Sequence, residues 1–221
     1  INADINQLKV ETNIKVEGEK LLCNSIIEFK GLNDNIYRHA FANRNISENE
    51  KLIKKILKKS SQDVQVNKLT IFPQNLLEDS NNVRINIDYE INDKVIDQNS
   101  YKVMNIPNMG EIFGVHNWLP GDLSLQKREY PLLSEYTASL SETTKIKFEK
   151  DYSVEYMPDN LEIKEDAYNY NYFYQIKNNE IIYKKYSAMN KMEYTPKEYL
   201  KIKEIFKKLQ VYEKKYIILK K

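Results

Sequence analysis

The segment from Tyr168 to Ile176 constrains the fold more than any other part of the chain. Its sequence, YNYNYFYQI, alternates aromatic and polar side chains, which is the period of a β-strand with one buried face. Asn178-Asn179 follows, and a second β-rich run extends from Ile181 to Tyr186. The two runs predict a hairpin with a tight, asparagine-rich turn. We therefore expect an antiparallel sheet in this half of the chain.

The N-terminal half shows the same strand signals. Apolar residues between Ile5 and Val16 and between Leu21 and Phe29 flank a Glu17-Gly18-Glu19 turn, and Gly31 closes the predicted hairpin. Further strands are predicted from clear alternation or from β-branched residues, at 66–71 and 83–91, and more weakly around 95–96 and 101–106. A β meander of short strands is expected at 136–140, 144–148 and 152–156, and a last strand at 215–220.

Two helices are predicted from their capping signals. Ser47-Glu48-Asn49-Glu50 has the form of a capping box and precedes an amphipathic stretch, which indicates a helix over about 48–60. Thr195-Pro196-Lys197-Glu198 combines an N-cap, a proline at the first helical position and an acid at the third, which indicates a helix over about 196–210. Residues 32–46 are expected to be irregular.

These elements favour a mainly β (α+β) fold of antiparallel, β-sandwich-like subdomains with two packed helices. Pro107, Pro120 and three of the five glycines fall between residues 107 and 130, so the loosest connection is expected there. We therefore divide the chain into a β-rich subdomain with one helix at 1–125 and, at 126–221, a β meander with the C-terminal helix and the final strand.

Composition narrows the classes of function. The chain has 34 basic and 32 acidic side chains and a formal net charge of +2, which gives no reason to expect nucleic acid as a partner. With five glycines and no glycine-rich phosphate loop, a nucleotide cofactor is not expected. No apolar segment is long enough to enter a membrane, and no signal peptide is recognisable, so the sequence is interpreted as a piece of a longer protein.

Candidates for catalysis and metal binding are few. Cys23 is the only cysteine and lies in an apolar run, which favours a structural role over a nucleophile paired with His39 or His116. Two histidines far apart give no metal-ligand spacing, so no metal and no cofactor are predicted. A glycosidase pair of carboxylates stays open, because its geometry is visible only in three dimensions.

One candidate binding surface is aromatic. The alternation predicts that Tyr168, Tyr170, Tyr172 and Tyr174 lie on one face of a strand, where they could stack on sugar rings or dock another domain. His116 and Trp118, the only tryptophan, lie in a conspicuous loop that is added to this candidate surface. The alternative, which we favour, is that the tyrosines pack beneath the 196–209 helix and that the loop caps the core.

The order of the elements resembles a known family. The C-terminal residues that carry the resemblance are Arg128-Glu129-Tyr130-Pro131, Tyr152 to Pro158, the hairpin, Tyr194 to Tyr199 with Phe206, and Tyr216 to Leu219. In this order they are similar to the C-terminal β region of bacterial transglutaminase-like proteins, and Leu8 to Gly31 resembles the segment just after the Cys-His-Asp core of that family. No catalytic motif of the family is matched, because Cys23 does not start a helix and neither histidine precedes an aspartate at a recognisable offset.

The resemblance implies a non-catalytic accessory β domain that packs on, or shapes the cleft of, an upstream transglutaminase-like core in the same chain. It also implies a periplasmic or cell-envelope location and a parent protein whose core, if active, is a cysteine peptidase or transglutaminase. Two alternatives stay open. The first is a stand-alone sandwich-type module that binds a glycan or peptide, and the second is a hydrolase in its own right, which requires a pocket with a suitable acid or a Cys–His pair.

Overall fold

The largest element of the fold is an eight-stranded sheet that contains strands from both halves of the chain. The computed structural model describes residues 2–77 and 81–221. The spatial order of the sheet is β10 (Leu161–Lys164), β11 (Tyr168–Lys177), β12 (Glu180–Met189), β8 (Ala138–Lys147), β1 (Gln7–Glu17), β2 (Lys20–Phe29), β4 (Arg84–Ile91) and β3 (Val64–Phe72). β1 and β8 are parallel, and the other neighbours are antiparallel.

Shorter elements form the second layer. A four-stranded sheet has the order β5 (Val95–Gln98), β6 (Tyr101–Met104), β14 (Ile217–Lys220) and β9 (Ser153–Tyr156), and β7 (Leu132–Leu133) pairs with β13 (Glu193–Tyr194). The helices are α1 (Leu32–Ala42), α2 (Ile46–Leu57), α3 (Met109–Ile112) and α4 (Pro196–Tyr212), with 3₁₀ turns η1 (Ala3–Asn6) and η2 (Val115–Trp118). The predicted mainly β fold class is confirmed.

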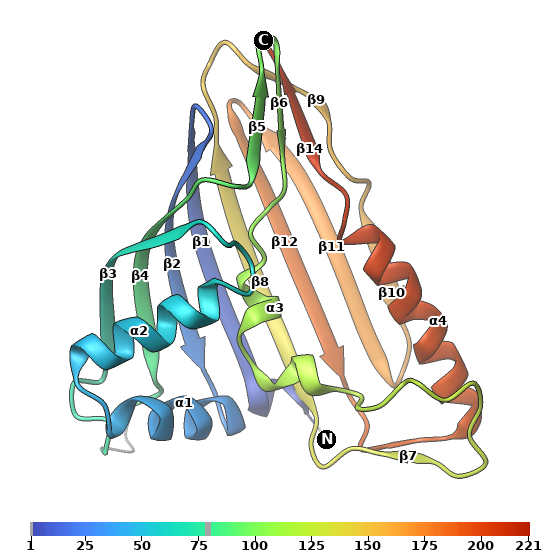
Figure 1. Cartoon of the computed structure of the whole chain (residues 1–221). Coiled ribbons are helices and arrows are strands. Elements are labelled where there is room, and N and C mark those ends of the chain that lie inside the picture. Colours follow the sequence, from blue (N-terminus) through green and yellow to red (C-terminus); the bar gives the residue numbers. More distant parts are fainter. Residues whose placement is uncertain (1, 78–80) are drawn as a thin grey trace.

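The large sheet buries one face only. On β1, even-numbered residues from Leu8 to Val16 are buried and their odd-numbered neighbours are mostly exposed, which is the alternation of a strand with one wet face. Figure 1 shows α1, α2, the small sheet and α4 in front of this sheet, so they cover its buried face as a second layer. The core lies between the two layers.

Strands that are distant in sequence meet in both sheets. Parallel pairing of β1 with β8 joins residues 7–15 to residues 139–147, and β14 pairs with β6 of the N-terminal half. Strands from both sides of residue 125 therefore share the large sheet and the small sheet. The predicted division into subdomains at 1–125 and 126–221 stays a prediction.

The two predicted helices are present, but the cap of the first was misplaced. α2 begins two residues earlier than expected, because Asn45 and not Ser47 is its N-cap. The Asn45 side chain accepts a hydrogen bond from the Glu48 amide at 3.0 Å, and the Glu48 carboxylate accepts one from the Asn45 amide at 2.9 Å. Asn45 and Glu48 have the same i, i+3 relation as the predicted Ser47 and Glu50. At α4, the predicted box of Thr195 and Glu198 is confirmed.

The expectation of an irregular stretch at 32–46 is wrong, since α1 occupies most of it. Gly31 precedes the helix with a φ of +56°, and a Cβ there would lie 2.3 Å from the Ile5 carbonyl oxygen, so glycine is required. The helix is held by tertiary contacts: the Tyr37 ring stacks on Phe29 at 4.1 Å, and the Arg38 side chain donates to the carbonyl of Leu76 at 2.8 Å. Its start has no side-chain cap to recognise in the sequence.

The strand pattern was mostly predicted. The hairpins β1–β2 and β11–β12 and the final strand β14 are confirmed. The separate strands expected at 136–140 and 144–148 are wrong, because one continuous strand, β8, spans 138–147 between β1 and β12. None of the helices that the structure describes is long and apolar enough to cross a membrane.

Candidate functional site

The four tyrosines of the predicted aromatic surface lie on one face of β11 and are buried. Tyr168, Tyr170, Tyr172 and Tyr174 all point toward the second layer. The Tyr170 ring meets Phe206 of α4 edge-on at 6.0 Å between centroids, and Tyr172 meets Tyr212 at 5.0 Å. The favoured packing interpretation accounts for these contacts, and a ligand would reach the ring faces only if α4 moved away. Their role in binding stays a prediction.

His116 and Trp118 lie on η2, where their environments differ. The Trp118 side chain is exposed. Burial, followed by the positive charge of the nearby Lys185, lowers the pKa of His116 to about 3, so its imidazole is neutral at pH 7. A neutral, buried imidazole cannot supply the charge that activates a thiolate. The binding role predicted for the two residues stays a prediction.

Cys23 lies on β2 with its side chain in the core. Burial raises the pKa of its thiol to about 12, and a hydrogen bond to Tyr89 opposes this effect. The sulfur also donates to the carbonyl of Leu21 at 3.7 Å. Among the described residues, no hydrogen bond joins Cys23 to His39 or His116. At neutral pH the thiol is therefore protonated and shielded, which is typical of a core residue.

A buried ionic cluster, which the sequence analysis missed, connects β12 to the second layer. The Lys185 ammonium group lies 3.1 Å from a carboxylate oxygen of Glu111 on α3 and 2.9 Å from one of Glu213, just after α4. The hydroxyl of Tyr172 donates to the same Glu213 oxygen at 2.6 Å. Glu142 of β8 lies opposite Lys185 in the sheet register, and its carboxylate accepts from the Gly110 amide at 3.3 Å.

The carboxyl groups of this cluster titrate differently because their surroundings differ. Burial raises the pKa of Glu142 to about 7, although Lys185 and the amide of Gly110 oppose the shift. Burial also raises the pKa of Glu111. At Glu213, burial is outweighed by Lys185 and by hydrogen bonds from its neighbours, so its pKa is lowered. Lys185 is kept charged, since Tyr183 and the surrounding carboxylates raise its pKa against the effect of burial.

The chemistry open to this cluster is limited. The cavity beside it has a volume of about 130 Å³ and is lined by Glu111, His116, Lys185 and Glu213 among others. Lys185 is charged and paired with two carboxylates, so it is not a free amine that could attack a carbonyl group. In the part of the chain that the structure describes, no three His, Cys, Asp or Glu side chains gather as metal ligands. We therefore interpret the cluster as a link between the sheet, α3 and α4.

The alternation of buried and exposed positions along β12 and β8 gave one indication of this cluster in the sequence. Ile181, Tyr183, Lys185 and Ser187 alternate along β12 and therefore lie on the same face of the strand. All four side chains are buried. A lysine at a buried strand position requires a counter-charge, because an unpaired buried ammonium group is strongly unfavourable. Glu142 likewise follows Leu140 on the buried face of β8. The carboxylates that Lys185 meets could not be identified without the tertiary structure.

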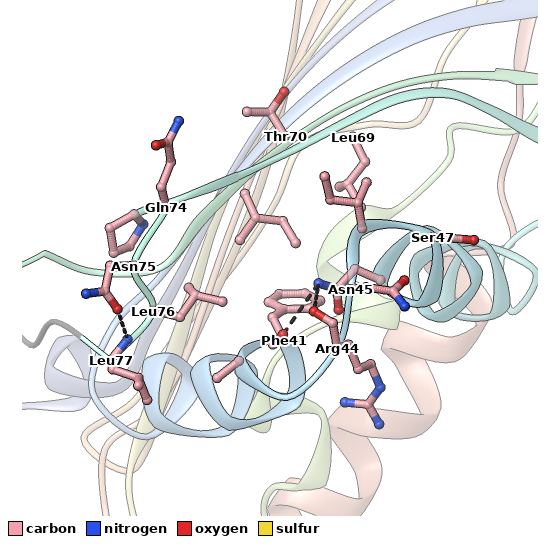
Figure 2. Close-up of a pocket in the computed structure, with 15 residues that line it drawn as sticks. Phe41, Arg44, Asn45, Ser47, Leu69, Thr70, Gln74, Asn75, Leu76 and Leu77 are labelled. Carbon is pink, nitrogen blue, oxygen red and sulfur yellow. Dashed lines mark hydrogen bonds between the residues drawn. The ribbon is translucent and has the colours of Figure 1, made fainter.

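A surface hollow lies elsewhere in the fold, between the α1–α2 turn and β3. We call it the β3 groove; its volume is about 870 Å³. Figure 2 shows Phe41 and Leu76 facing the space between the helices and the strand. The lining residues are Phe41, Ala42, Arg44, Asn45, Ile46, Ser47, Asn49, Leu69, Thr70, Ile71, Pro73, Gln74, Asn75, Leu76 and Leu77.

The β3 groove is apolar and open. Ile46 is 76% exposed and Leu77 is 82% exposed, so two large apolar side chains at its border face solvent. Arg44 is the only charged side chain among the described residues that line it, and no Cys, His, Asp or Glu is among them. The hydroxyls of Ser47 and Thr70 lie in the groove, but its described lining holds no His, Asp or Glu that could act as a base beside them.

Comparisons with known proteins give a family match for about the C-terminal half. The family described as "Domain of Unknown Function with solved-structure structure" (DUF3858) matches residues 112–219. A solved structure from Parabacteroides distasonis, described as a "putative protease", is similar at 14% sequence identity with a TM-score of 0.45, over 56% of this chain and 24% of that chain. The chain thus spans about a quarter of that protein's length. No curated protein matches.

Proposed function

We propose that the chain is a non-catalytic accessory β domain of a longer protein and that it docks onto an upstream transglutaminase-like or cysteine-peptidase-like core. The observation that carries the proposal is the β3 groove, an open and largely apolar surface whose described lining has no Cys, His, Asp or Glu. Large exposed apolar side chains at the border of a groove, here Ile46 and Leu77, favour contact with another protein or domain.

The candidate nucleophile and the titratable cluster fit the same proposal. Cys23 is buried and protonated at neutral pH, and Lys185 is held between two carboxylates. Both groups are engaged inside the fold, so contacts with a partner would involve other, exposed residues. The resemblance of residues 128–219 to the C-terminal β region of bacterial transglutaminase-like proteins supports the same role. From this resemblance we propose a periplasmic or cell-envelope location for the parent protein.

Deletion of this region from the parent protein tests the proposal. We expect removal of residues 1–221 to lower the midpoint of thermal unfolding of the remaining core and to reduce its activity, because a docked domain stabilises the partner that it contacts. The isolated region added back in trans should restore part of both. A core that keeps its unfolding midpoint and its activity after the deletion would refute the accessory role.

A further inference from the structure

The β3 groove lies beside an unpaired sheet edge. β3 is the last strand of the eight-stranded sheet, and its only partner in the sheet order is β4. A register shift between Val66 and Lys68 interrupts the first part of the strand, which leaves Lys68–Phe72 as a regular edge. An edge strand of this kind can accept a further strand through its backbone groups.

The direction of the backbone groups follows from the ladder. The Asn92 amide donates to the Asp63 carbonyl, so even-numbered residues on the β4 side direct their backbone groups toward β3. In an antiparallel ladder every second residue pair is hydrogen-bonded. The even-numbered residues Asp88, Asn86 and Arg84 of β4 therefore bond to the residues opposite them on β3, which are Lys68, Thr70 and Phe72. Leu69 and Ile71 occupy the alternate positions on β3. Their N–H and C=O groups therefore point outward at the free edge.

The side chains of the same two residues line the groove. Leu69 and Ile71 are half-buried and pack against the core, and Phe41 and Leu76 line the groove with them. Backbone donors and acceptors thus lie directly beside an apolar hollow. A strand that paired with this edge would place every second side chain toward that hollow, because strand side chains alternate between the two faces.

The surroundings of the groove are basic. The two segments that frame it, residues 41–59 and 64–77, contain seven Lys or Arg residues and two Glu residues, although the whole chain has a net charge of only +2. One of the two acids, Glu48, is hydrogen-bonded in the cap of α2. Arg44 is the charged side chain among the described residues that line the groove, and the lysines of α2 are exposed further along the helix whose first residues line it. This distribution of charge favours an acidic partner.

We propose that the β3 groove binds an extended, acidic peptide segment of another protein or domain, which adds a strand to β3 at Leu69 and Ile71. Apolar side chains at alternate positions of the peptide enter the groove, and carboxylates outside it face the basic border. The inference rests on the proposed docking function and specifies its partner. Two residues offer edge hydrogen bonds, so the expected affinity of a short peptide is weak.

A displayed library of random peptides of about twelve residues, long enough to cover the regular edge of β3, tests the inference. The library is selected against the complete 221-residue chain. We expect enriched peptides to alternate apolar residues with Asp or Glu. The strongest of them is then synthesised and its Kd is measured by fluorescence anisotropy against the wild type and the variants below.

Matched variants separate binding at the groove from general effects of charge and hydrophobicity. Ile46→Asp and Arg44→Glu should each weaken binding by about tenfold or more, which corresponds to the loss of one strong contact. Neither change removes a buried apolar side chain, since Ile46 and Arg44 are both exposed. The controls are Val211→Asp, at an exposed position of α4, and Lys184→Glu, at an exposed position of β12. Each control should change the Kd by less than about twofold.

Backbone methylation tests the strand addition itself. Methylation of alternate amides in one register of the peptide should abolish binding, whereas methylation in the other register should leave it, because only one set faces β3. The inference is overturned if no peptide is enriched, if the enriched peptides lack alternation or acids, or if the groove variants bind as the wild type does. It is also overturned if the chain forms a dimer that Arg44→Glu dissociates, because a second copy would then be the occupant.

These outcomes are distinguishable from failure of the docking function. If deletion of residues 1–221 alters the parent core but the peptide tests fail, the accessory role stands and the partner contacts another surface. If the peptide tests succeed but the deletion has no effect, the groove binds a partner outside the parent core.

Discussion

Glu142 provides a test of whether the buried cluster has been interpreted correctly. Its side chain is 1% exposed, lies on β8 opposite Lys185, and has a pKa raised to about 7, chiefly by burial. The perturbation is Glu142→Gln, which keeps the shape of the protonated acid and removes its ability to ionise. A glutamine can still accept the hydrogen bond that the Gly110 amide donates.

The expected size of the effect follows from the two pKa values. In the unfolded chain the carboxyl titrates near its ordinary value of 4.5, whereas in the folded protein it titrates at about 7. Between these values the folded state holds a proton that the unfolded state has released, so this group's contribution to stability falls as the pH rises. Above pH 7 the wild type should have lost about 3 kcal/mol of the stability that this group contributes below pH 4.5.

The assay is urea unfolding of the wild type and the variant at several pH values. The stability of Glu142→Gln relative to the wild type should be near zero at about pH 4 and should increase to about 3 kcal/mol in favour of the variant at about pH 8. Only the difference between the two proteins is interpreted, because other groups titrate in both. Glu162→Gln, at an exposed position on β10, is the matched control and should show no such trend.

Two results would contradict this reasoning. If the difference between Glu142→Gln and the wild type does not change with pH, the carboxyl has the same pKa in the folded and unfolded states, and burial does not raise it. If the variant becomes less stable than the wild type as the pH rises, the ionised carboxylate stabilises the fold, and the charge of Lys185 outweighs the cost of burial.

Three further predictions concern the buried lysine, the cysteine and the last helix. Lys185→Met should destabilise the protein by about 3 kcal/mol or more, because two carboxylates lose their buried partner, whereas Lys184→Met, one residue away on the exposed face, should have little effect on urea unfolding. Cys23 should react with a thiol reagent only when the chain unfolds; fast reaction of the folded protein would contradict its burial and its raised pKa. Thr195→Ala should lower the free energy of unfolding by about 1 kcal/mol through loss of the α4 cap, and an unchanged value would show that the cap does not limit stability.

Local pattern was sufficient to predict most strands, but not their partners. The hairpins β1–β2 and β11–β12 connect neighbouring segments, and both were predicted because alternation and turn residues are local properties. The pairing of β1 with β8 joins segments about 130 residues apart, and no turn signal encodes it. The same limit explains α1, whose stability comes from the contact of Tyr37 with Phe29 and not from a cap.

At the candidate sites too, the sequence predicted local features, and the tertiary structure decided the contacts. Alternation placed the four tyrosines between Tyr168 and Tyr174 on one face, but only the position of α4 established that this face is covered. A lysine on the buried face of β12 was visible in the sequence, whereas Glu111 and Glu213 reach it from α3 and from the end of α4. The β3 groove had no sequence signal, because two segments that are separate in the sequence line it.

The sequence by itself therefore determined the mainly β class, the strand faces, the existence of the two longest helices and the position of Cys23 within an apolar strand, since each depends on residues that are close together in the chain. The tertiary structure decided which strands share a sheet, which carboxylates pair with Lys185, and where β3 has a free edge beside an apolar hollow. These features depend on contacts between distant segments, and such contacts depend on the packing of the whole chain and not on the pattern of any one part.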